Sequence, residues 1–275
     1  AMVSEWGEPD KSLIGGFHMD FLLHFGPSHY NDLFRCEEPY FSSRGKGSAK
    51  EFVEKYKENY EKTNGRGLIC IPSGNHDMDR LARSLSPEEM KIAFAFLLSM
   101  PGAPFIYYGD EIGLRYVEGL TSVEGGYGRT GSRSPMQWDK TPNDGFSSAP
   151  AEKLYVKQDD APDRPDAASQ CADETSLRSE VKRLIALRMA HPALQSKGTV
   201  SFLADNYPLA YVRSSAEESI LVIINPSAAP AVLSAEELCA ANKKILYTVG
   251  GTVKENADHT LQVDGGTAAF IALTK

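Results

Sequence analysis

A polar tetrapeptide closes a short apolar stretch in the first third of the chain. The stretch is Leu-Ile-Cys-Ile-Pro at positions 68–72, and Gly74-Asn75-His76-Asp77 follows it after one serine. An imidazole, a carboxamide and a carboxylate are therefore expected at the C-terminal end of a buried strand, where barrel enzymes carry their catalytic residues. Asn and Asp also stabilise turns by bonding nearby backbone, so the tripeptide taken alone equally fits an ordinary turn.

Two further segments place acidic residues at the ends of predicted strands. Upstream, Val3-Ser4 precedes Glu5 and Trp6, and downstream the apolar residues 105–108 precede Asp110 and Glu111. Two carboxyl groups that share one cleft can divide the work of proton donor and nucleophile. The three segments together therefore predict acid–base chemistry.

These segments resemble the α-amylase superfamily, the glycoside hydrolases that cleave or transfer α-glucosidic bonds on a (β/α)8 barrel. In that family the acid/base Glu follows the fifth strand and Asn-His-Asp follows the seventh. Residues 102–111, Gly-Ala-Pro-Phe-Ile-Tyr-Tyr-Gly-Asp-Glu, are similar to the pattern of the eighth. Residues 126–138, which end in Ser-Pro-Met-Gln-Trp, are similar to the Arg-Thr-Pro-Met-Gln-Trp segment of the oligo-1,6-glucosidase, α-glucosidase and trehalose-synthase branch. Thr130 stands where that branch often has Asp, so fine specificity is not carried over.

The resemblance implies an α/β fold that corresponds to the later part of such an enzyme. Residues 1–195 are expected to form the C-terminal half of a (β/α)8 TIM barrel, strands five to eight, and residues 196–275 an antiparallel β-sandwich domain. Half a barrel leaves strand edges unpaired, and such edges favour self-association. The expected ligands are α-glucans or α-glucoside oligosaccharides.

The resemblance also assigns roles to residues. Glu5 takes the place of the acid/base and Asp77 that of the transition-state stabiliser. The expected substrate-binding residues are His76, Asn75, Arg80, Arg133 and Trp6. Retaining cleavage needs two carboxyl groups about 5 Å apart, and the family places the nucleophilic Asp upstream of the acid. The chain by itself is therefore expected to be inactive.

Several alternatives remain open from the residues alone. Glu8 competes with Glu5 for the acid role, and Gly16-Phe-His-Met-Asp20 superficially resembles the family's nucleophile motif. His76 and Asp77 could form a metal site with Asp79, although three adjacent positions do not close such a site. Arg80 could hold Asp77 or cap the next helix. The chain could also be a transglycosylase or isomerase such as a trehalose synthase, a non-catalytic carbohydrate-binding module, or a structural amylase-like fragment.

Helices and strands that could position these residues follow from periodicity and caps. Helices are expected at residues 48–62 and 175–190. Another helix is expected to begin at Pro87, where Ser86 and Glu89 can form a capping box. Residues 119–172 are expected to be loop. Beyond residue 198 short β runs follow one another, at 209–212, 220–224, 245–249 and 268–273.

Composition excludes several other classes of protein. The net charge is −8, and no Lys/Arg cluster with interleaved aromatic residues indicates nucleic-acid binding. No apolar run is long enough to cross a bilayer. The four cysteines, at positions 36, 70, 171 and 239, indicate neither a disulfide framework nor a zinc site. No cofactor or metal is predicted; calcium is conceivable in the full enzyme but is not indicated here. A cytoplasmic location is favoured, and the natural N-terminus is expected to lie upstream.

Overall fold

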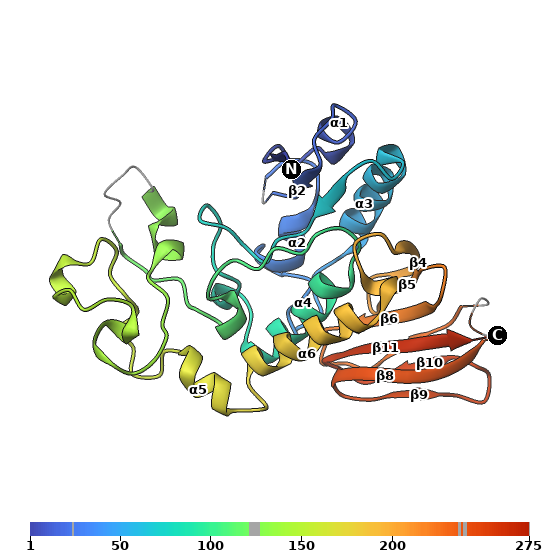
Figure 1. Cartoon of the computed structure of the whole chain (residues 1–275). Helices are drawn as coiled ribbons and strands as arrows, with labels where there is room; N and C mark the ends of the chain where they lie inside the picture. Colours follow the sequence, from blue (N-terminus) through green and yellow to red (C-terminus); the bar gives the residue numbers. More distant parts are fainter. Residues whose placement is uncertain (24, 121–126, 236–237, 239–240, 275) are drawn as a thin grey trace.

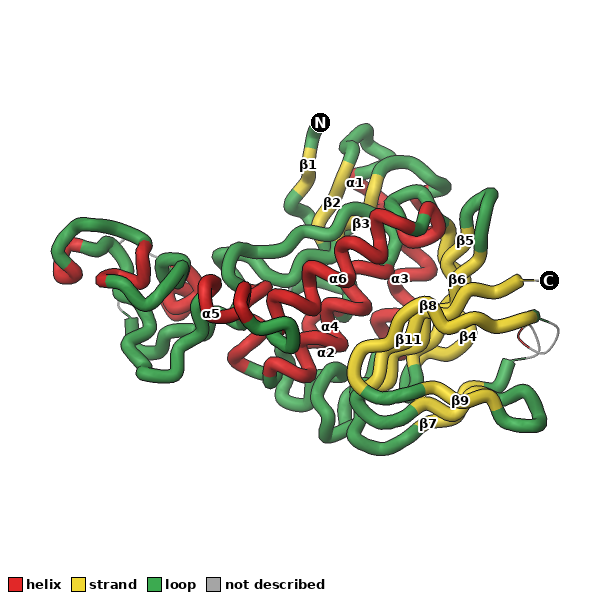
Figure 2. Tube along the Cα trace, turned by 60° about the horizontal axis from the view of Figure 1, so that its bottom comes forward, coloured by secondary structure: helices red, strands yellow, loops and turns green. Residues whose placement is uncertain are grey.

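The N-terminal part of the protein is built on a small parallel sheet. The structure is a computed structural model, and it describes residues 1–23, 25–120, 127–235, 238 and 241–274. The strands β1 (Val3–Ser4), β2 (Met19–Phe21) and β3 (Leu68–Cys70) pair in the order β1-β2-β3 and lie side by side in Figure 2. Because all three are parallel, the segments that follow them meet at one edge of the sheet.

The segment 105–108 forms a single bridge in place of the expected strand. Phe105 makes a parallel bridge with Pro72, and Ser73 N donates to Phe105 O at 2.8 Å. Beyond this bridge Tyr107 N donates to the Ser73 side chain at 2.9 Å, so a hydroxyl takes the place of a ladder carbonyl. The prediction of a strand over 105–108 is therefore wrong, although the segment lies beside β3 as expected.

Helices alternate with these strands along the chain and continue up to the C-terminal sheets. The α-helices are α1 (Pro9–Ser12), α2 (Tyr30–Phe34), α3 (Lys50–Thr63), α4 (Pro87–Ser99), α5 (Ala167–Ala172) and α6 (Leu177–Ala190). The 3₁₀ helices are η1 (Leu81–Arg83), η2 (Asp110–Ile112), η3 (Tyr127–Arg133), η4 (Pro142–Gly145), η5 (Ala151–Lys153) and η6 (Pro192–Leu194). The predicted helices correspond to α3, α4 and α6, and the predicted capping box is confirmed: Glu89 N donates to Ser86 Oγ at 3.3 Å and Ser86 N donates to Glu89 Oε2 at 2.7 Å.

Helix α4 is the centre of the main hydrophobic core. Its residues from Ile92 to Ser99 are all buried, so the helix is enclosed on every side. The Phe96 ring packs on Phe41, Phe52 and Tyr211, with centroids 5.5, 5.8 and 6.5 Å away. These contacts join α3, α4 and the C-terminal sheet in one core.

Two antiparallel sheets make up the C-terminal part of the chain. The five-stranded sheet has the order β4-β5-β6-β11-β8 and the three-stranded sheet the order β7-β10-β9. Their strands are β4 (Thr199–Asp205), β5 (Leu209–Ser214), β6 (Ser219–Asn225), β7 (Ala231–Leu233), β8 (Asn242–Gly250), β9 (Val253–Glu255), β10 (Leu261–Val263) and β11 (Thr267–Thr274). Successive side chains of β6 point to opposite faces, so Val222 joins the α4 core while Leu221 and Ile223 pack in the core of the three-stranded sheet.

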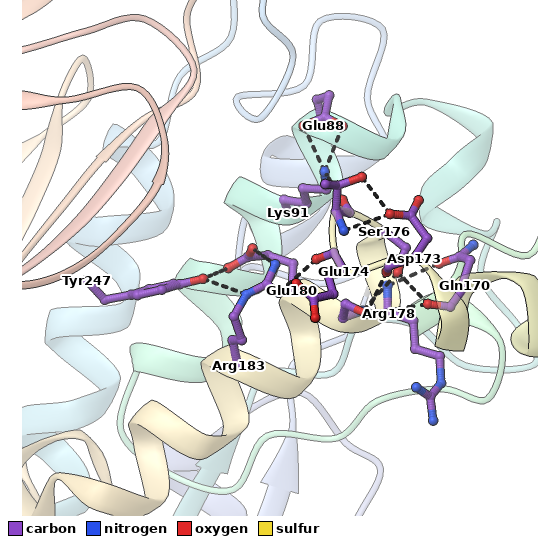
Figure 3. Close-up of polar contacts among 12 residues, drawn as sticks. Glu88, Lys91, Gln170, Asp173, Glu174, Ser176, Arg178, Glu180, Arg183 and Tyr247 are labelled. Carbon is purple, nitrogen blue, oxygen red and sulfur yellow. Dashed lines mark hydrogen bonds and ion pairs between the residues drawn. The ribbon is translucent and has the colours of Figure 1, made fainter.

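Polar contacts join α6 to this sheet. Tyr247 of β8 donates its hydroxyl proton to Glu180 Oε1 at 2.6 Å and accepts from Arg183 Nε at 2.8 Å, as Figure 3 shows. Near the other end of α6, the buried Arg188 donates to the carbonyl oxygens of residues 98, 100 and 102 at 2.8–2.9 Å. The last of these is Gly102, whose φ of +88° turns the chain from α4 back to the sheet.

Residues 115–120 and 127–166 form a lobe that projects from the body of the protein, on the side away from the C-terminal sheets (Figure 1). The lobe contains η3, η4 and η5, and α5 follows it, where the sequence predicts only loop. The buried Asp144 accepts from Arg164 through both Nε and Nη2, with the shortest contact at 2.5 Å. This ion pair, which the sequence pattern does not reveal, joins η4 to the segment before α5.

The described part of the chain contains no helix long and apolar enough to span a membrane, and no group of three or more side chains placed to hold a metal ion. Cys36, Cys70 and Cys171 are free thiols. Cys239 and Gly126, which figure in the sequence analysis, lie outside the described residues.

Candidate active site

In the turn after β3, the side chain of Asn75 holds the backbone of Asp77. Asn75 Oδ1 accepts from Asp77 N at 2.8 Å. Asn75 therefore forms the turn that the tripeptide alone suggests, and the same turn fixes the direction of Asp77. The turn and the functional interpretation of these residues are compatible.

Two arginines of the lobe hold the Asp77 carboxylate. Asp77 Oδ1 lies 3.0 Å from Arg129 Nη1 and 2.9 Å from Arg133 Nη2. Arg133 also donates from Nε to the backbone oxygen of His76 at 2.9 Å. Charge-assisted bonds of this kind are stronger than neutral ones and fix the geometry of the carboxylate. The carboxylate keeps a quarter of its side-chain surface exposed, at 25%.

Glu5 follows β1, and the backbone beyond it is fixed by Asp20. Asp20 is fully buried; its Oδ1 accepts from Trp6 N at 3.2 Å and from Gly7 N at 3.4 Å, and its Oδ2 accepts from Ser12 Oγ at 2.7 Å. Asp20 is thus a structural residue in this conformation and is unavailable as a nucleophile.

Glu8, the competitor for the acid role, is engaged on the surface. It accepts from Lys11 Nζ at 2.5 Å and from Trp6 Nε1 at 2.8 Å. Both hydrogen bonds favour the ionised carboxylate, so the pKa of Glu8 lies below its ordinary value. A carboxylate held ionised in this way is poorly suited to donate a proton.

A pocket of about 420 Å³ brings several predicted residues together. It is lined by Val3, Ser4, Glu5, Phe21, Leu23, Pro72, Gly74, Asn75, His76, Phe105, Ile106 and Tyr107. Glu5 supplies the single carboxyl group among these described lining residues, His76 and Asn75 add hydrogen-bonding side chains, and much of the remaining lining is apolar. Asp77 adjoins the lining through His76, whereas Trp6, Arg80 and Arg133 do not line the pocket.

Arg80 is buried and bonds a different carboxylate from the one expected. Its guanidinium donates to Asp110 Oδ1 at 3.0 Å and to the carbonyl of Tyr108, and it lies 4.2 Å and 4.6 Å from the ring centres of Tyr107 and Tyr108. The suggestion that Arg80 holds Asp77 is therefore wrong. Arg129 and Arg133 hold it, and Arg80 is 1% exposed, out of reach of a ligand in this conformation.

Asp110 links this buried arginine to the turn after β3. Asp110 Oδ2 accepts from Ser73 Oγ at 2.7 Å, and Ser73 in turn receives Tyr107 N. Burial raises the pKa of the Tyr107 hydroxyl, which keeps it neutral. The sequence places Asp110 only at the mouth of the barrel and does not reveal its pairing with Arg80 and Ser73.

A metal site at this turn finds no support among the described residues. Asp79 Oδ2 pairs with Arg83 Nη1 at 2.8 Å, so this carboxylate is already engaged. His76 and Asp77 remain as possible ligands, and His76 Nε2 lies 3.6 Å from Asp77 Oδ2. Two ligands on adjacent positions do not make a metal site.

The comparisons with known proteins identify the family. The family model described as "Alpha amylase, catalytic domain" matches residues 26–197, which is more than half of the chain. The chain belongs to the α-amylase family. Its N-terminal 25 residues, with Glu5, lie outside that match, so the family assignment rests on residues 26–197, which include the Asn75–Asp77 turn.

Curated relatives of this α-amylase family chain are similar over part of their length. The trehalose synthase/amylase TreS of Mycobacterium tuberculosis is 36% identical over 162 residues, which is 55% of this chain and 26% of that protein. A probable α-glucosidase of Rhizobium meliloti is 30% identical over 225 residues, 75% of this chain and 39% of that protein. The chain therefore matches well under half the length of these relatives.

Solved structures show the same fold. The crystal structure of the α-amylase from H. orenii superposes with a TM-score of 0.75 at 20% identity, and the match covers 99% of this chain and 53% of that one. A mutant of the trehalulose synthase MutB gives a TM-score of 0.74 at 21% identity over 94% of this chain and 51% of that one. The chain therefore superposes on about half of each of these solved structures.

Proposed function

We propose that the protein of which this chain is part is a retaining glycoside hydrolase of the α-glucosidase type, acting on α-glucosidic bonds of oligosaccharides. The observation that carries the proposal is the pocket that Glu5, Asn75 and His76 line together, next to an Asp77 carboxylate held by two arginines. Polar groups that converge on an otherwise apolar pocket are typical of ligand sites.

The proposed roles follow from this arrangement. Glu5 donates a proton to the leaving oxygen and then, as a carboxylate, accepts one from the attacking water. His76 and Asp77 bind hydroxyls of the same glucosyl unit, and Asp77 favours the charged transition state. Asn75 holds the turn, Arg133 holds Asp77, and Arg80 acts as a positioning residue through Asp110. The nucleophile is contributed by a segment outside residues 1–275, since Glu5 is the one carboxyl group among the described lining residues.

The proposed architecture is half of a barrel with an added domain. Residues 1–195 are the C-terminal half of a (β/α)8 barrel, with β1, β2, β3 and the Phe105 bridge as its fifth to eighth strands. Residues 196–275 are a β-sandwich domain. The parallel pairing of the three strands and the two antiparallel sheets after residue 198 support this division.

The test compares this chain with a version extended upstream through a predicted nucleophile, on a chromogenic α-glucoside. We expect turnover by the extended version alone, and loss of at least about a thousandfold on Glu5→Gln or Asp77→Asn, as for removal of a group that acts in the transition state. Lys11→Gln, which changes the nearby surface pair with Glu8, is the matched control and should leave turnover unchanged. An extended version that acts on no α-glucoside contradicts the proposal.

Hydrolysis and transfer are separated by product analysis of the same extended version. The similarity to TreS favours transfer or isomerisation as a second candidate function. Incubation with maltose and chromatography of the products distinguishes the two: glucose alone indicates hydrolysis, and a non-reducing or differently linked disaccharide indicates transfer.

We also propose that the chain self-associates through the edges of its parallel sheet. Val3 and Phe105, at the two ends of this sheet, are 44% and 39% exposed. Unpaired strand edges with apolar side chains favour pairing with another chain. Light scattering at micromolar concentration should give a mass above that of one chain, and a stable monomer contradicts this part of the proposal.

A further inference from the structure

A cavity of about 550 Å³ lies at the edge of the parallel sheet opposite the candidate active site. Met19 and Leu68, the first residues of β2 and β3, line this cavity, whereas the candidate active site is built from the segments that follow the strands. The two sites share no lining residue among the described ones. The volume is within the range of sites that hold small molecules.

Tyr56 of α3 lines the cavity with a hydroxyl group that lacks a hydrogen-bond partner. The residue is 2% exposed, and its hydroxyl makes no hydrogen bond with the described residues. Burial raises the pKa of this hydroxyl, so it stays protonated and can donate. The ring of Tyr60, which also lines the cavity, lies at 16° to that of Tyr56 with a centroid distance of 6.1 Å. A buried donor without an acceptor is costly, so this hydroxyl is a group that a bound ligand would satisfy.

The described lining carries positive charge and no carboxylate. Lys197 lines the cavity and forms no ion pair with the described residues. His18 adds a donor: Met2 N donates to its Nδ1 at 2.9 Å, so the proton of the neutral ring is on Nε2. None of the described lining residues is Asp or Glu, although the net charge of the chain is −8. The cavity is therefore a cationic site on an acidic protein.

Two buried arginines beside the cavity add to this charge. Arg188 donates to the oxygen of Gly102, a lining residue, at 2.8 Å, and Arg213 Nη2 donates to the oxygens of residues 195 and 198, on either side of Lys197. Among the described residues both guanidinium groups bond backbone carbonyls alone, so no carboxylate neutralises them. Burial lowers the pKa of each group to about 10, which leaves both charged at pH 7. Charge of one sign around a cavity raises the local concentration of ions of the other sign.

We infer that this cavity binds a small organic anion. Lys197 and the two buried arginines attract its acidic group, and His18 Nε2 and the Tyr56 hydroxyl donate hydrogen bonds to it. Its apolar part packs against the ring of Tyr60 and the first residues of β2 and β3. A carboxylate and a phosphate monoester share this chemistry. The inference is independent of the proposed function, because the site lies at the other edge of the sheet and its test requires no turnover.

Calorimetric titration of this chain with phenyl phosphate and, separately, with benzoate tests the inference. We expect at least one of the two anions to bind at one site per chain, and the tighter one identifies the acidic group. Benzyl alcohol, a neutral analogue, should bind at least about tenfold more weakly. Lys197→Met should raise the Kd at least about tenfold, the usual effect of losing a bond to a charged group. Lys254→Met, which removes the same charge from an exposed position on β9, is the matched control and should leave the Kd unchanged.

Tyr56→Phe distinguishes a ligand-binding hydroxyl from a structural one. We expect the Kd to rise roughly tenfold, because a hydrogen bond to the charged ligand is lost. The melting temperature of the ligand-free protein should not fall, because the hydroxyl has no partner to lose. A lower melting temperature together with an unchanged Kd overturns the inference, since the hydroxyl then serves the fold and not a ligand.

Other results also overturn the inference. Failure of both anions to bind does so, and so does equally tight binding of benzyl alcohol, which shows an apolar cavity without recognition of charge. Inorganic phosphate that competes with phenyl phosphate and binds as tightly indicates an adventitious ion only. Binding that Lys197→Met leaves unchanged takes place elsewhere on the chain. Circular dichroism of each variant establishes that it is folded.

Discussion

Replacing Asp110 by Asn should destabilise the protein more than any single change on its surface. Asp110 and Arg80 are 2% and 1% exposed, and their contact is 3.0 Å long. The Asn side chain has the same shape but no charge, so the Arg80 guanidinium stays buried without an anion. Two of its nitrogens, Nε and Nη2, already have no hydrogen-bond partner among the described residues. Removing one partner of such a pair costs about 3–5 kcal/mol.

The matched control is Asp79→Asn, which breaks an equivalent pair on the surface. Asp79 and Arg83 are bonded at 2.8 Å, but their side chains are 39% and 40% exposed, so the loss should be within about 1 kcal/mol. A change of 1 kcal/mol shifts the melting temperature of a chain of this size by about 2–4 °C. Calorimetry should therefore show a fall of roughly 6 °C or more for Asp110→Asn and of at most about 4 °C for the control. Equal shifts for the two variants would refute the reasoning that burial decides the strength of this pair.

Three further predictions follow from other buried groups. Arg188→Met should lower the melting temperature by roughly 4 °C or more, because three carbonyl oxygens at the end of α4 lose their donor; an unchanged value would show that they are satisfied in another way. Burial raises the pKa of the Cys70 thiol to about 12. In the folded protein at pH 8, iodoacetamide should therefore modify the exposed Cys171, whereas Cys70 should react only after denaturation. Peptide mass spectrometry measures both reactions. Burial also raises the pKa of Glu111 in the folded protein above its unfolded value of about 4.5. The folded state therefore binds this proton more tightly, and the stabilisation that the proton gives is lost as the pH rises through the folded pKa. Glu111→Gln should thus raise the melting temperature at pH 7 but not at pH 4.

The sequence predicts those elements whose signals are local. Ser86, Pro87 and Glu89 define the start of α4 within four residues, and the structure has that capping box. The apolar run before Asn75 likewise predicts β3, because a short run flanked by turn residues needs no distant partner to be recognised. Residues 105–108 show the limit of this reasoning: their composition favours a strand, but the Ser73 hydroxyl binds Tyr107 N and takes it out of the ladder.

The candidate site likewise has a part that the sequence predicts and a part that it does not. The types and spacing of Asn75, His76 and Asp77 are sufficient to predict polar side chains at a strand end, and the side chain of Asn75 makes the predicted turn within two residues. Glu5, by contrast, lies 71 residues before His76 in the chain, and a parallel sheet is required to bring the two to one pocket. A charge–charge contact between distant residues leaves no local pattern in the sequence.

The sequence by itself thus determined the family, the helices with explicit caps and the residue types at the strand ends, because each depends on neighbours within a few positions. The tertiary structure alone decided which arginine pairs with which carboxylate. Arg129 and Arg133 of the lobe pair with Asp77, whereas Arg80, only three residues from Asp77, lies in the core and pairs with Asp110. The physical reason is that a guanidinium at the end of a long side chain bonds the carboxylate that packing brings within about 3 Å, and this distance is set by the assembled core and not by separation along the chain.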